Sequence, residues 1–323
     1  MKLSIVTTLY KSAPYIEEFH RRSSEAARQL VGEDYEIIMV NDGSPDDSLN
    51  VALTFVEMDP HLKVVNLSRN FGHHKAMITG LQYCAGDLVF LLDGDLEEEP
   101  EWLLSFAQQL AVEKCDVVYG VQKKRKGAIF ERLSGMMFYK CINILCNIKL
   151  PKNITTARLM RRKYVKALLL YREREVVFAL LCADTGFKQS GMIVTKHSIS
   201  PTTYTFLKKL NIVTGAITSF SSLPLRIISW IGAIISAGSL LYAFFIAMRI
   251  LFWGQALDGW TSIMVSIWIL GGLIIFFLGI IGTYLANVFS EAKQRPLTII
   301  SDVYDGSELN KQITQNDMRA KAV

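Results

Sequence analysis

Several features that would define other protein classes are missing from this sequence of 323 residues. Its five cysteines form no Cys-x-x-Cys pair and no Cys/His ligand spacing, so we expect reduced structural thiols rather than a zinc site. The first ten residues lack a charged lead, a long apolar run and a cleavage site, so no signal peptide is expected. No segment resembles a nucleic-acid-binding module, and we expect no nucleic-acid partner.

Charged residues are also missing from two long stretches in the last third of the chain. Ile227–Met248 contains 22 residues without a charge, and Gly259–Ser290 contains 32. A helix of about 20 apolar residues is long enough to cross a hydrocarbon core. The sequence therefore predicts a transmembrane helical hairpin over residues 223–290. Two buried helices of a soluble protein are the alternative, which uncharged runs of this length disfavour.

The charges that flank these stretches predict how the hairpin is oriented. Basic residues lie at its two outer ends, whereas the connecting loop carries only Asp258. Basic residues favour the cytoplasmic side, so we expect a multi-pass protein of the inner, cytoplasmic membrane with the preceding domain and both termini inside the cell. Residues 291–323 are expected to be a cytoplasmic polar tail. The glycine-rich helices could pack against a second copy as a homo-oligomer.

Charge is distributed very unevenly in the middle of the chain. Gly86–Gly120 holds nine acidic residues and one basic residue, whereas Val121–Glu175 holds fifteen basic residues and three acidic ones. A basic block before a membrane segment predicts contact with anionic lipid headgroups or with a phosphorylated substrate. Residues 126–150 form a basic amphipathic pattern that either lies on the bilayer or packs on the domain. Residues 204–220 are a second candidate interfacial helix.

The first ninety residues alternate between continuous apolar runs and segments with helical spacing. Strands are predicted at residues 3–10, 35–40, 62–68 and 87–93, and helices at 14–30, 48–58 and 73–86. Runs that are apolar throughout, rather than at every second position, are typical of strands buried on both faces. The pattern predicts an α/β domain over residues 1–222, with a mostly parallel sheet and helices on both faces.

Polar turns follow the second and fourth predicted strands. They read "NDGS" around Asp42 and "DGD" from Asp93 to Asp95. Ligands of parallel sheets bind at the carboxyl ends of strands, so these carboxylates are expected near one ligand. A D-x-D pair supplies oxygen ligands suited to Mg²⁺ or Mn²⁺, and such an ion stabilises a diphosphate leaving group. An acidic, solvated surface turn is the alternative, since D-x-D pairs are common there.

Five motifs together resemble the family-2 glycosyltransferases, and more closely the polyprenyl-phosphate glycosyltransferases. That group includes the bactoprenol glucosyl transferases and relatives of dolichol-phosphate mannose synthase. The resemblance runs from about residue 3 to 300. It implies a GT-A (Rossmann-like) fold, a nucleotide-sugar donor, a divalent metal and inversion at the anomeric carbon. The motifs are "VNDGSPDDS", "LSRNFGHHKA", "LLDGDLEEEPEW", "RLMRR" and "ITSFSSLPLR".

The resemblance also implies roles for individual residues. Asp42 would contact the nucleotide base, Asp93 and Asp95 would bind the metal and the diphosphate, and Glu97 would be a third metal ligand where the family usually has Gln. The implied catalytic residues are Asp93, Asp95 and Arg158. The implied donor-binding residues are Asp42, Gly43, Arg69, Asn70 and Asp93. The implied acceptor- and phosphate-binding residues are Arg158, Arg161 and His197.

Neighbouring polar residues receive weaker expectations. Glu98 and Glu99 are expected to form only a solvated helix start, where acidic side chains are ordinarily favourable. For His73 and His74, a helix start or a contact with the donor phosphates is favoured over a metal-binding role. The first nucleotide loop departs from the family pattern P-x-[YF]-N-E, because it reads "TLYKS" with Thr8 in place of the proline.

Two further departures concern the acceptor. The family pattern G-D-F-R-L-M reads "TTARLM", with Thr156 in place of a functional aspartate, while Arg158 is kept. The pattern R-x-x-G-x-S-K reads "HSISPTT", so His197 replaces arginine and Thr203 replaces lysine. A phosphate acceptor is already anionic at neutral pH and needs cations rather than a base. A sugar hydroxyl instead needs a base to take its proton.

These observations favour one function and leave two alternatives open. The favoured one is a membrane-anchored, metal-dependent, inverting glycosyltransferase that moves a sugar from a nucleotide-sugar donor to a polyprenyl phosphate. The first alternative keeps the fold and adds the sugar to a lipid-linked saccharide in surface-polysaccharide assembly. The second is a non-catalytic membrane scaffold, suggested by the altered "TTARLM" segment.

Overall fold

The structure is a computed structural model that describes residues 1–123, 153–174, 176–196, 221–253 and 259–307. It divides into two compact units. The first holds Met1–Tyr139, Ile148–Thr203 and Pro296–Val323, and the second holds Lys140–Asn147 and Tyr204–Arg295. The predicted interfacial helices at 126–150 and 204–220 lie outside the described residues, as do His197 and Thr203.

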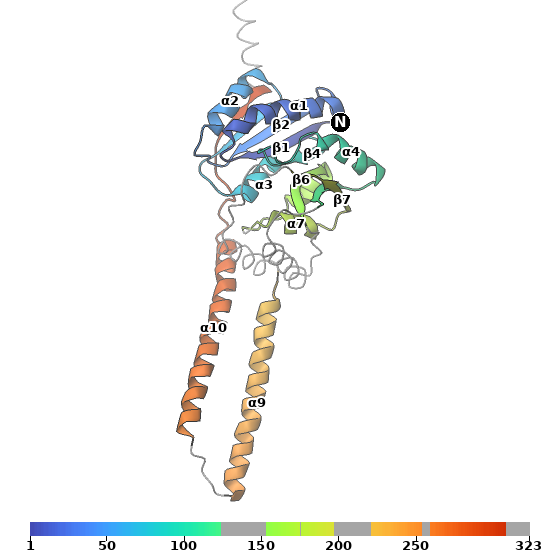
Figure 1. Cartoon of the computed structure of the whole chain (residues 1–323). Helices are drawn as coiled ribbons and strands as arrows, with labels where there is room; N and C mark the ends of the chain where they lie inside the picture. The colour runs from blue at the N-terminus through green and yellow to red at the C-terminus, as the bar shows by residue number, and fades with distance from the viewer. Residues whose placement is uncertain (124–152, 175, 197–220, 254–258, 308–323) are drawn as a thin grey trace, which may run out of the picture. The chain divides into compact units, whose positions relative to one another are not determined.

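An eight-stranded mixed sheet forms the centre of the first unit, in the order β7-β5-β6-β4-β1-β2-β3-β8 (Figure 1). Its strands are β1 (Leu3–Leu9), β2 (Tyr35–Asn41), β3 (Leu62–Leu67), β4 (Leu88–Leu91), β5 (Val117–Gln122), β6 (Ile154–Arg161), β7 (Gln189–Val194) and β8 (Ile300–Asp305). The helices of this unit are η1 (Ala13–Tyr15), α1 (Ile16–Val31), α2 (Ser48–Met58), α3 (His73–Tyr83), α4 (Trp102–Val112), α6 (Arg162–Leu168) and α7 (Phe178–Asp184).

The four strands predicted from the sequence form the parallel centre of the sheet. β1 pairs in parallel with both β2 and β4, and β2 pairs in parallel with β3. This confirms the predicted α/β fold. The other four strands were not predicted. They add three antiparallel pairs, β3 with β8, β4 with β6 and β5 with β6, and a parallel pair of β5 with β7.

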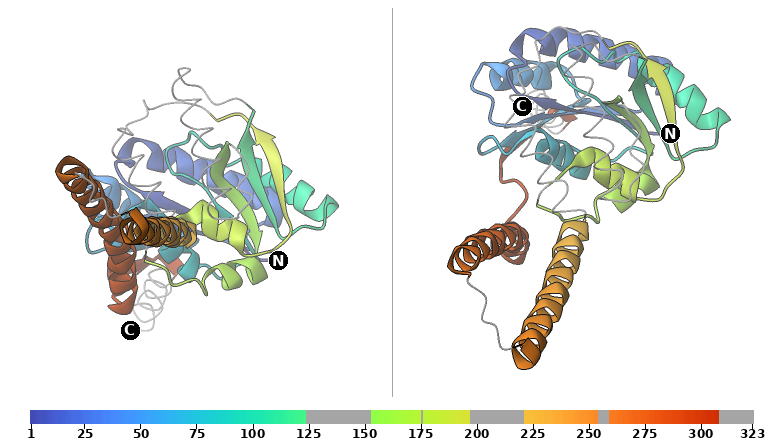
Figure 2. Two further views of the ribbon diagram at one scale, coloured as in Figure 1. Left: turned by 90° about the horizontal axis from the view of Figure 1, so that it is seen from below. Right: turned by 60° about the horizontal axis from the view of Figure 1, so that its bottom comes forward.

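Helices cover both faces of the parallel strands, which is why β1 is buried along its whole length (Figures 1 and 2). Ile5 points into the core cluster that Phe19 of α1 also joins. Val6, the next residue, points to the opposite face, where a Cβ added to Gly80 of α3 would lie 2.5 Å from its Cγ1 atom. Burying each such side chain stabilises the fold by about 1.5–3 kcal/mol.

The expected polar tail is partly wrong, because the chain returns to the sheet after its last helix. β8 pairs antiparallel with the edge of β3. The Lys63 ammonium lies 2.8 Å from the Asp305 carboxylate, and the Thr79 and Thr298 hydroxyls are 2.7 Å apart. The segment "ISDVYD" has mixed polarity because it is an edge strand, so its sequence does not resemble the buried strands.

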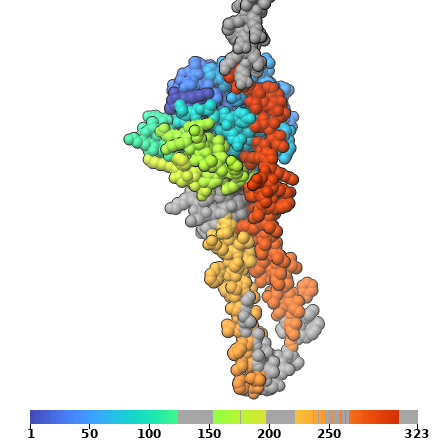
Figure 3. Space-filling model, turned by 180° about the vertical axis from the view of Figure 1, so that it is seen from behind, coloured from blue at the N-terminus to red at the C-terminus, as the bar shows by residue number. Residues whose placement is uncertain are grey.

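The second unit contains the two long helices α9 (Leu223–Trp253) and α10 (Trp260–Ala292). Large apolar side chains stand at the surface along both, including Trp230 at 72% exposure and Trp268 at 77%. Figure 3 draws both helices as space-filling atoms. Within the described residues, one stretch meets the length and hydropathy of a membrane span, namely Ser266–Ala292.

The close approach of Gly306 to α2 allows a test of the returning strand. A Cβ added there would lie 2.8 Å from the carbonyl oxygen of Val56 and would overlap that of Asp59. We expect Gly306→Ala to lower the free energy of unfolding by about 1–3 kcal/mol, because the backbone atoms must shift. Thermal unfolding measures this loss, and hydrogen exchange should show faster exchange of the β8 amides.

The matched control for Gly306→Ala is Gly232→Ala in α9, since no atom lies within 4 Å of an added Cβ there. This control should leave β8 exchange unchanged. Equal exchange at β8 in the wild type and in Gly306→Ala would contradict the docking of this strand.

Candidate active site

The carboxyl ends of β1, β2, β3 and β4 meet at one edge of the sheet because these strands run parallel. The turn with Asp42 follows β2, the loop with Arg69 and Asn70 follows β3, and the loop with Asp93 and Asp95 follows β4. The structure therefore brings the predicted donor-binding and metal-binding residues to one rim.

Asp42 organises the loop that follows β3. Its side chain is almost fully buried, and its two carboxylate oxygens accept N–H bonds from Phe71 at 2.7 Å and from Gly72 at 3.0 Å. Its backbone carbonyl accepts a bond from the Asn70 side chain at 3.1 Å. Burial raises the pKa of Asp42, and the two backbone N–H groups oppose that shift. The contact of Asp42 with a nucleotide base stays a prediction.

Gly43 lets this turn approach the same loop closely. Its φ angle is +57°, and an added Cβ would overlap the backbone of Arg69 and Asn70. Glycine is therefore required here for both backbone conformation and space. The guanidinium of Arg69 lies over the Phe71 ring at 4.1 Å and stays exposed at the rim, where it could meet an anionic ligand.

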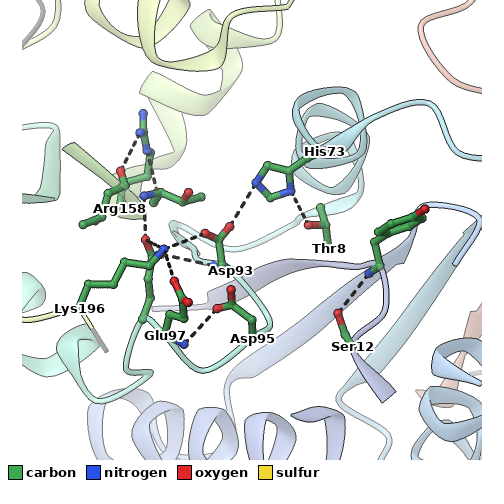
Figure 4. A network of polar contacts seen from close by, with 12 residues as sticks. Thr8, Ser12, His73, Asp93, Asp95, Glu97, Arg158 and Lys196 are labelled. Atoms are coloured by element: carbon green, nitrogen blue, oxygen red, sulfur yellow. Dashed lines mark hydrogen bonds and ion pairs between the residues drawn. The ribbon is translucent and has the colours of Figure 1, made fainter. Parts of the chain in front are cut away.

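The acidic loop, residues Asp93–Glu98 after β4, contacts Lys196, a lysine to which the sequence analysis assigned no role (Figure 4). Lys196 lies two residues beyond β7, and its ammonium is 3.6 Å from Asp93 and 3.2 Å from Glu97. Asp95 accepts the Glu97 N–H at 3.0 Å. Burial, followed by the charge of Asp93, raises the pKa of Asp95. Burial opposes the charge of Lys196, but the surrounding carboxylates outweigh it and raise the pKa of Lys196.

Glu98 was predicted to be a solvated helix start, and this prediction is wrong. Its side chain is 0% exposed. One carboxylate oxygen accepts the Thr156 N–H at 2.9 Å and lies 3.6 Å from Lys196, while the other accepts the Asp93 N–H at 3.4 Å. Burial and the charge of Asp93 raise the pKa of Glu98. Glu98 thus connects the β4 loop with β6.

His73 joins the acidic loop to β1 (Figure 4). It is the first residue of α3, as the helix-start interpretation predicted. Its Nδ1 atom lies 2.9 Å from the Thr8 hydroxyl and its Nε2 atom 3.2 Å from an oxygen of Asp93. With the proton of a neutral ring on Nε2, the Thr8 hydroxyl donates to Nδ1. Thr8, which replaces the proline of the family pattern, therefore orients this imidazole.

His73 and Lys196 together set the state of Asp93. Burial tends to raise the pKa of Asp93, but His73 and Lys196 outweigh it, and the net pKa lies below its usual range. The structure thus favours an ionised carboxylate at this position. The second histidine, His74, contacts the Val176 carbonyl with its Nδ1 atom at 2.8 Å, so it faces a different neighbour.

The predicted arginines separate along β6. Arg158 pairs in register with Leu91, at the acidic end of β4. Its side chain is buried, donates to the Thr156 carbonyl at 3.1 Å and lies 4.7 Å from the centre of the Phe178 ring. These contacts fix the guanidinium near the acidic loop, and its contact with an acceptor stays a prediction.

The phosphate-binding prediction for Arg161 is not supported by its position. It pairs with Leu88 at the opposite end of β4 and donates to the Cys115 carbonyl at 3.1 Å. It lies three positions along the strand from Arg158, which corresponds to about 10 Å. The sequence of "RLMRR" could not predict which end of the sheet each arginine lies at. That position depends on the direction in which β6 runs, and the antiparallel pairing with β4 sets this direction.

The acidic loop offers suitable atoms for a divalent ion. Among the residues that the structure describes, no three His, Cys, Asp or Glu side chains are grouped as a metal site. Asp93 and Glu97 nevertheless converge on one cation, the Lys196 ammonium. The other oxygen of Asp93, Oδ1, is buried and lies 3.2 Å from His73 Nε2 without a well-aligned hydrogen bond, so it keeps the capacity to bind a cation. These oxygen donors are therefore of the kind that Mg²⁺ or Mn²⁺ prefers.

Residues 4–169 match the family model described as "Glycosyl transferase family 2". The chain belongs to this family. A Mycobacterium tuberculosis protein described as "Putative glycosyltransferases" is 45% identical over 96% of this chain and 90% of its own length. The "Prophage bactoprenol glucosyl transferase homolog" of Escherichia coli K12 is 28% identical over 94% of this chain and 99% of its own.

The name of a third relative of this glycosyltransferase also contains a polyprenyl acceptor. The "Undecaprenyl-phosphate 4-deoxy-4-formamido-L-arabinose transferase" of Shewanella sediminis is 29% identical over 94% of this chain and 93% of its own. These similarities confirm the predicted glycosyltransferase activity and the predicted resemblance to transferases that act on polyprenyl phosphates.

The contacts of Asp42 predict how this glycosyltransferase responds to loss of one carboxylate oxygen. In Asp42→Asn, the amide oxygen can accept only one of the two N–H groups, that of Phe71 or that of Gly72. The amide nitrogen is a donor and cannot accept the other. An unsatisfied buried donor costs about 1–3 kcal/mol, so the melting temperature of the free enzyme should fall. Thermal unfolding checks this.

The exposed Asp47→Asn serves as the matched control for Asp42→Asn and should unfold like the wild type. A melting temperature of Asp42→Asn equal to that of the control would show that Asp42 does not hold the loop.

Proposed function

We propose that this glycosyltransferase moves a sugar from a nucleotide-sugar donor to a polyprenyl phosphate, with inversion at the anomeric carbon, and that it uses Mg²⁺ or Mn²⁺. The observation that carries the proposal is the single rim on which Asp93 and Asp95 lie with the loop held by Asp42. Such a rim can accommodate the base and the diphosphate of one donor.

The residues of the acidic loop have distinct parts in this proposal. Asp93, Asp95 and Glu97 would hold the divalent ion, which neutralises the charge that develops on the diphosphate leaving group. His73 and Thr8 keep the Asp93 side chain oriented. Arg69 is an exposed cation on the neighbouring loop and suits the donor phosphates.

A polyprenyl phosphate suits this site as an acceptor for a chemical reason. A phosphate monoester is an anion at neutral pH and attacks without a general base. Thr156 lies at the acidic loop and, unlike the aspartate of the family pattern, adds no further negative charge there. The two relatives named for bactoprenol and undecaprenyl phosphate match 94% of this chain each, which supports the same acceptor class.

A lipid-linked saccharide is the second candidate acceptor, and His73 is the observation that favours it. A sugar hydroxyl must lose its proton, and the Nδ1 atom of His73, which among the described residues accepts only the rotatable Thr8 hydroxyl, is a base within the site. The scaffold alternative is disfavoured because the chain belongs to an enzyme family and keeps both aspartates of the D-x-D pair.

The location of the reaction is also part of the proposal. Helices α9 and α10 span 31 and 33 residues, or about 46 and 50 Å at 1.5 Å per residue, which is enough to cross a bilayer. We propose that they form the membrane hairpin, with the catalytic domain and both termini on the cytoplasmic face. The catalytic domain is then the first compact unit, which includes β8, rather than the predicted residues 1–222.

Asp95 provides the first test of the mechanism. In Asp95→Asn the site loses one negative ligand, so the rate of transfer should fall about a hundredfold or more. The assay uses the full chain in detergent with a panel of nucleotide sugars and polyprenyl phosphate, read out by mass spectrometry of the lipid. The exposed Asp302→Asn on β8 is the control and should keep wild-type activity. Normal turnover of Asp95→Asn in EDTA would refute the metal mechanism.

The acceptor is tested separately with a radiolabelled donor. We expect labelled lipid from purified polyprenyl phosphate alone, because the phosphate is itself the nucleophile. Product that forms only when a glycan primer is added would instead select the lipid-linked saccharide.

Cysteine labelling tests the membrane topology. The native cysteines are replaced by alanine, and a single cysteine is placed at Gly259 or at Lys293, beside the two ends of α10. In intact cells a membrane-impermeant maleimide should label Gly259→Cys, whereas Lys293→Cys should react only after permeabilisation. The same labelling behaviour at both positions would contradict the hairpin.

A further inference from the structure

Lys196 is the one described cation that contacts several carboxylates of the acidic loop at once. Its ammonium lies between 3.2 and 3.6 Å from Asp93, Glu97 and Glu98. The side chain is 20% exposed, so the ammonium is largely shielded from water but can still be reached. It comes from the segment after β7, at the far edge of the sheet from β3.

The loop needs this charge when no other cation is present. Four carboxylates crowd into Asp93–Glu98, and Glu98 is fully buried. A buried carboxylate without a partner is strongly unfavourable. The ammonium supplies this partner for Glu98 and also faces the two carboxylates, Asp93 and Glu97, that the proposed function assigns to the divalent ion.

An ammonium and a divalent ion cannot occupy the same position. Like charges a few ångströms apart repel strongly in a partly buried site, where screening by water is weak. The side chain of lysine is long and flexible and carries its three donors on a single rotatable end. It can therefore leave the carboxylates without movement of the backbone, and a phosphate oxygen of the reaction is a suitable new partner.

We propose that Lys196 is the resident cation of this site and competes with the divalent ion for Asp93 and Glu97. The free enzyme is then charge-compensated without metal and binds the ion weakly. The ion enters together with a diphosphate, whose negative charge receives the displaced ammonium. This inference rests on the proposed metal-dependent function, and it adds that metal and donor bind in a coupled manner.

A purely structural lysine gives a different expectation. If Lys196 only stabilised Glu98, its removal would weaken the fold and leave the metal affinity unchanged or lower. The competition proposal requires the opposite sign, because removal of the ammonium takes away a positive charge that repels the ion from Asp93 and Glu97. Metal affinity therefore separates the two roles.

The test measures binding of Mn²⁺ alone to the full chain in detergent, by the electron paramagnetic resonance signal of the free ion. Lys196→Met should bind Mn²⁺ at least tenfold more tightly than the wild type. Lys196→Arg keeps the charge and should stay within about threefold of it. The control is Lys163→Met, which removes an exposed lysine paired with Asp116 at 2.6 Å, and it should bind like the wild type.

A second variant covers the case in which Lys196→Met does not fold. Lys196→Met combined with Glu98→Gln removes the ammonium and the buried charge it pairs with, so the core keeps no unpaired ion. This double variant should also bind Mn²⁺ more tightly than the wild type, and Mn²⁺ should raise its melting temperature more. Unchanged or weaker binding in the folded variants would overturn the proposal.

Asp95→Asn distinguishes this failure from failure of the proposed function. If the wild type binds Mn²⁺, Asp95→Asn does not, and Lys196→Met equals the wild type, the metal site stands and the competition is refuted. If no variant binds Mn²⁺ alone, Lys196→Met included, the competition is refuted, whereas the metal-dependent mechanism is refuted only by transfer that continues in EDTA.

Discussion

Compensation of negative charge at the end of β4 is the constraint on which the site depends. Four carboxylates follow this buried strand within six residues, and one of them, Glu98, has no exposed surface. Such a group of charges is stable in a low-dielectric setting only when donors and cations face it. The structure meets this need with an imidazole, an ammonium and two backbone N–H groups.

These partners come from segments far apart in the chain. His73 comes from α3, the Thr156 N–H from β6, and Lys196 from the segment after β7. The antiparallel strand β6 is essential here, because its pairing with β4 places Thr156 and Arg158 at the acidic end and Arg161 at the other. The same need for compensation connects structure with function. In the function proposed above, a site that holds positive charge when empty suits a divalent ion and a diphosphate, and the Lys196 ammonium then has to move.

The turn with Asp42, at the same rim of the sheet, is held by backbone N–H donors rather than by charged side chains. Asp42 uses both carboxylate oxygens to hold the loop after β3, and Gly43 allows that loop to approach. The rim around Asp42 is therefore shaped by contacts within the chain itself. The return of the chain through β8 to the edge of β3 places residues from both sides of the long helices in one sheet.

The sequence by itself determined the parallel centre of the fold, because strands buried on both faces are apolar at every position and end in recognisable polar turns. It also predicted that Asp42, Asp93 and Asp95 lie at one rim of the sheet, since motif and strand end coincide at each of them. Tertiary structure alone decided the burial of Glu98, the position of Lys196 and the separation of Arg158 from Arg161. The physical reason is that the environment of a charged side chain is set by the strands that pair and pack around it. In this protein those strands lie sixty to a hundred residues further along the chain, and no local pattern around "LLDGDLEEEPEW" records them.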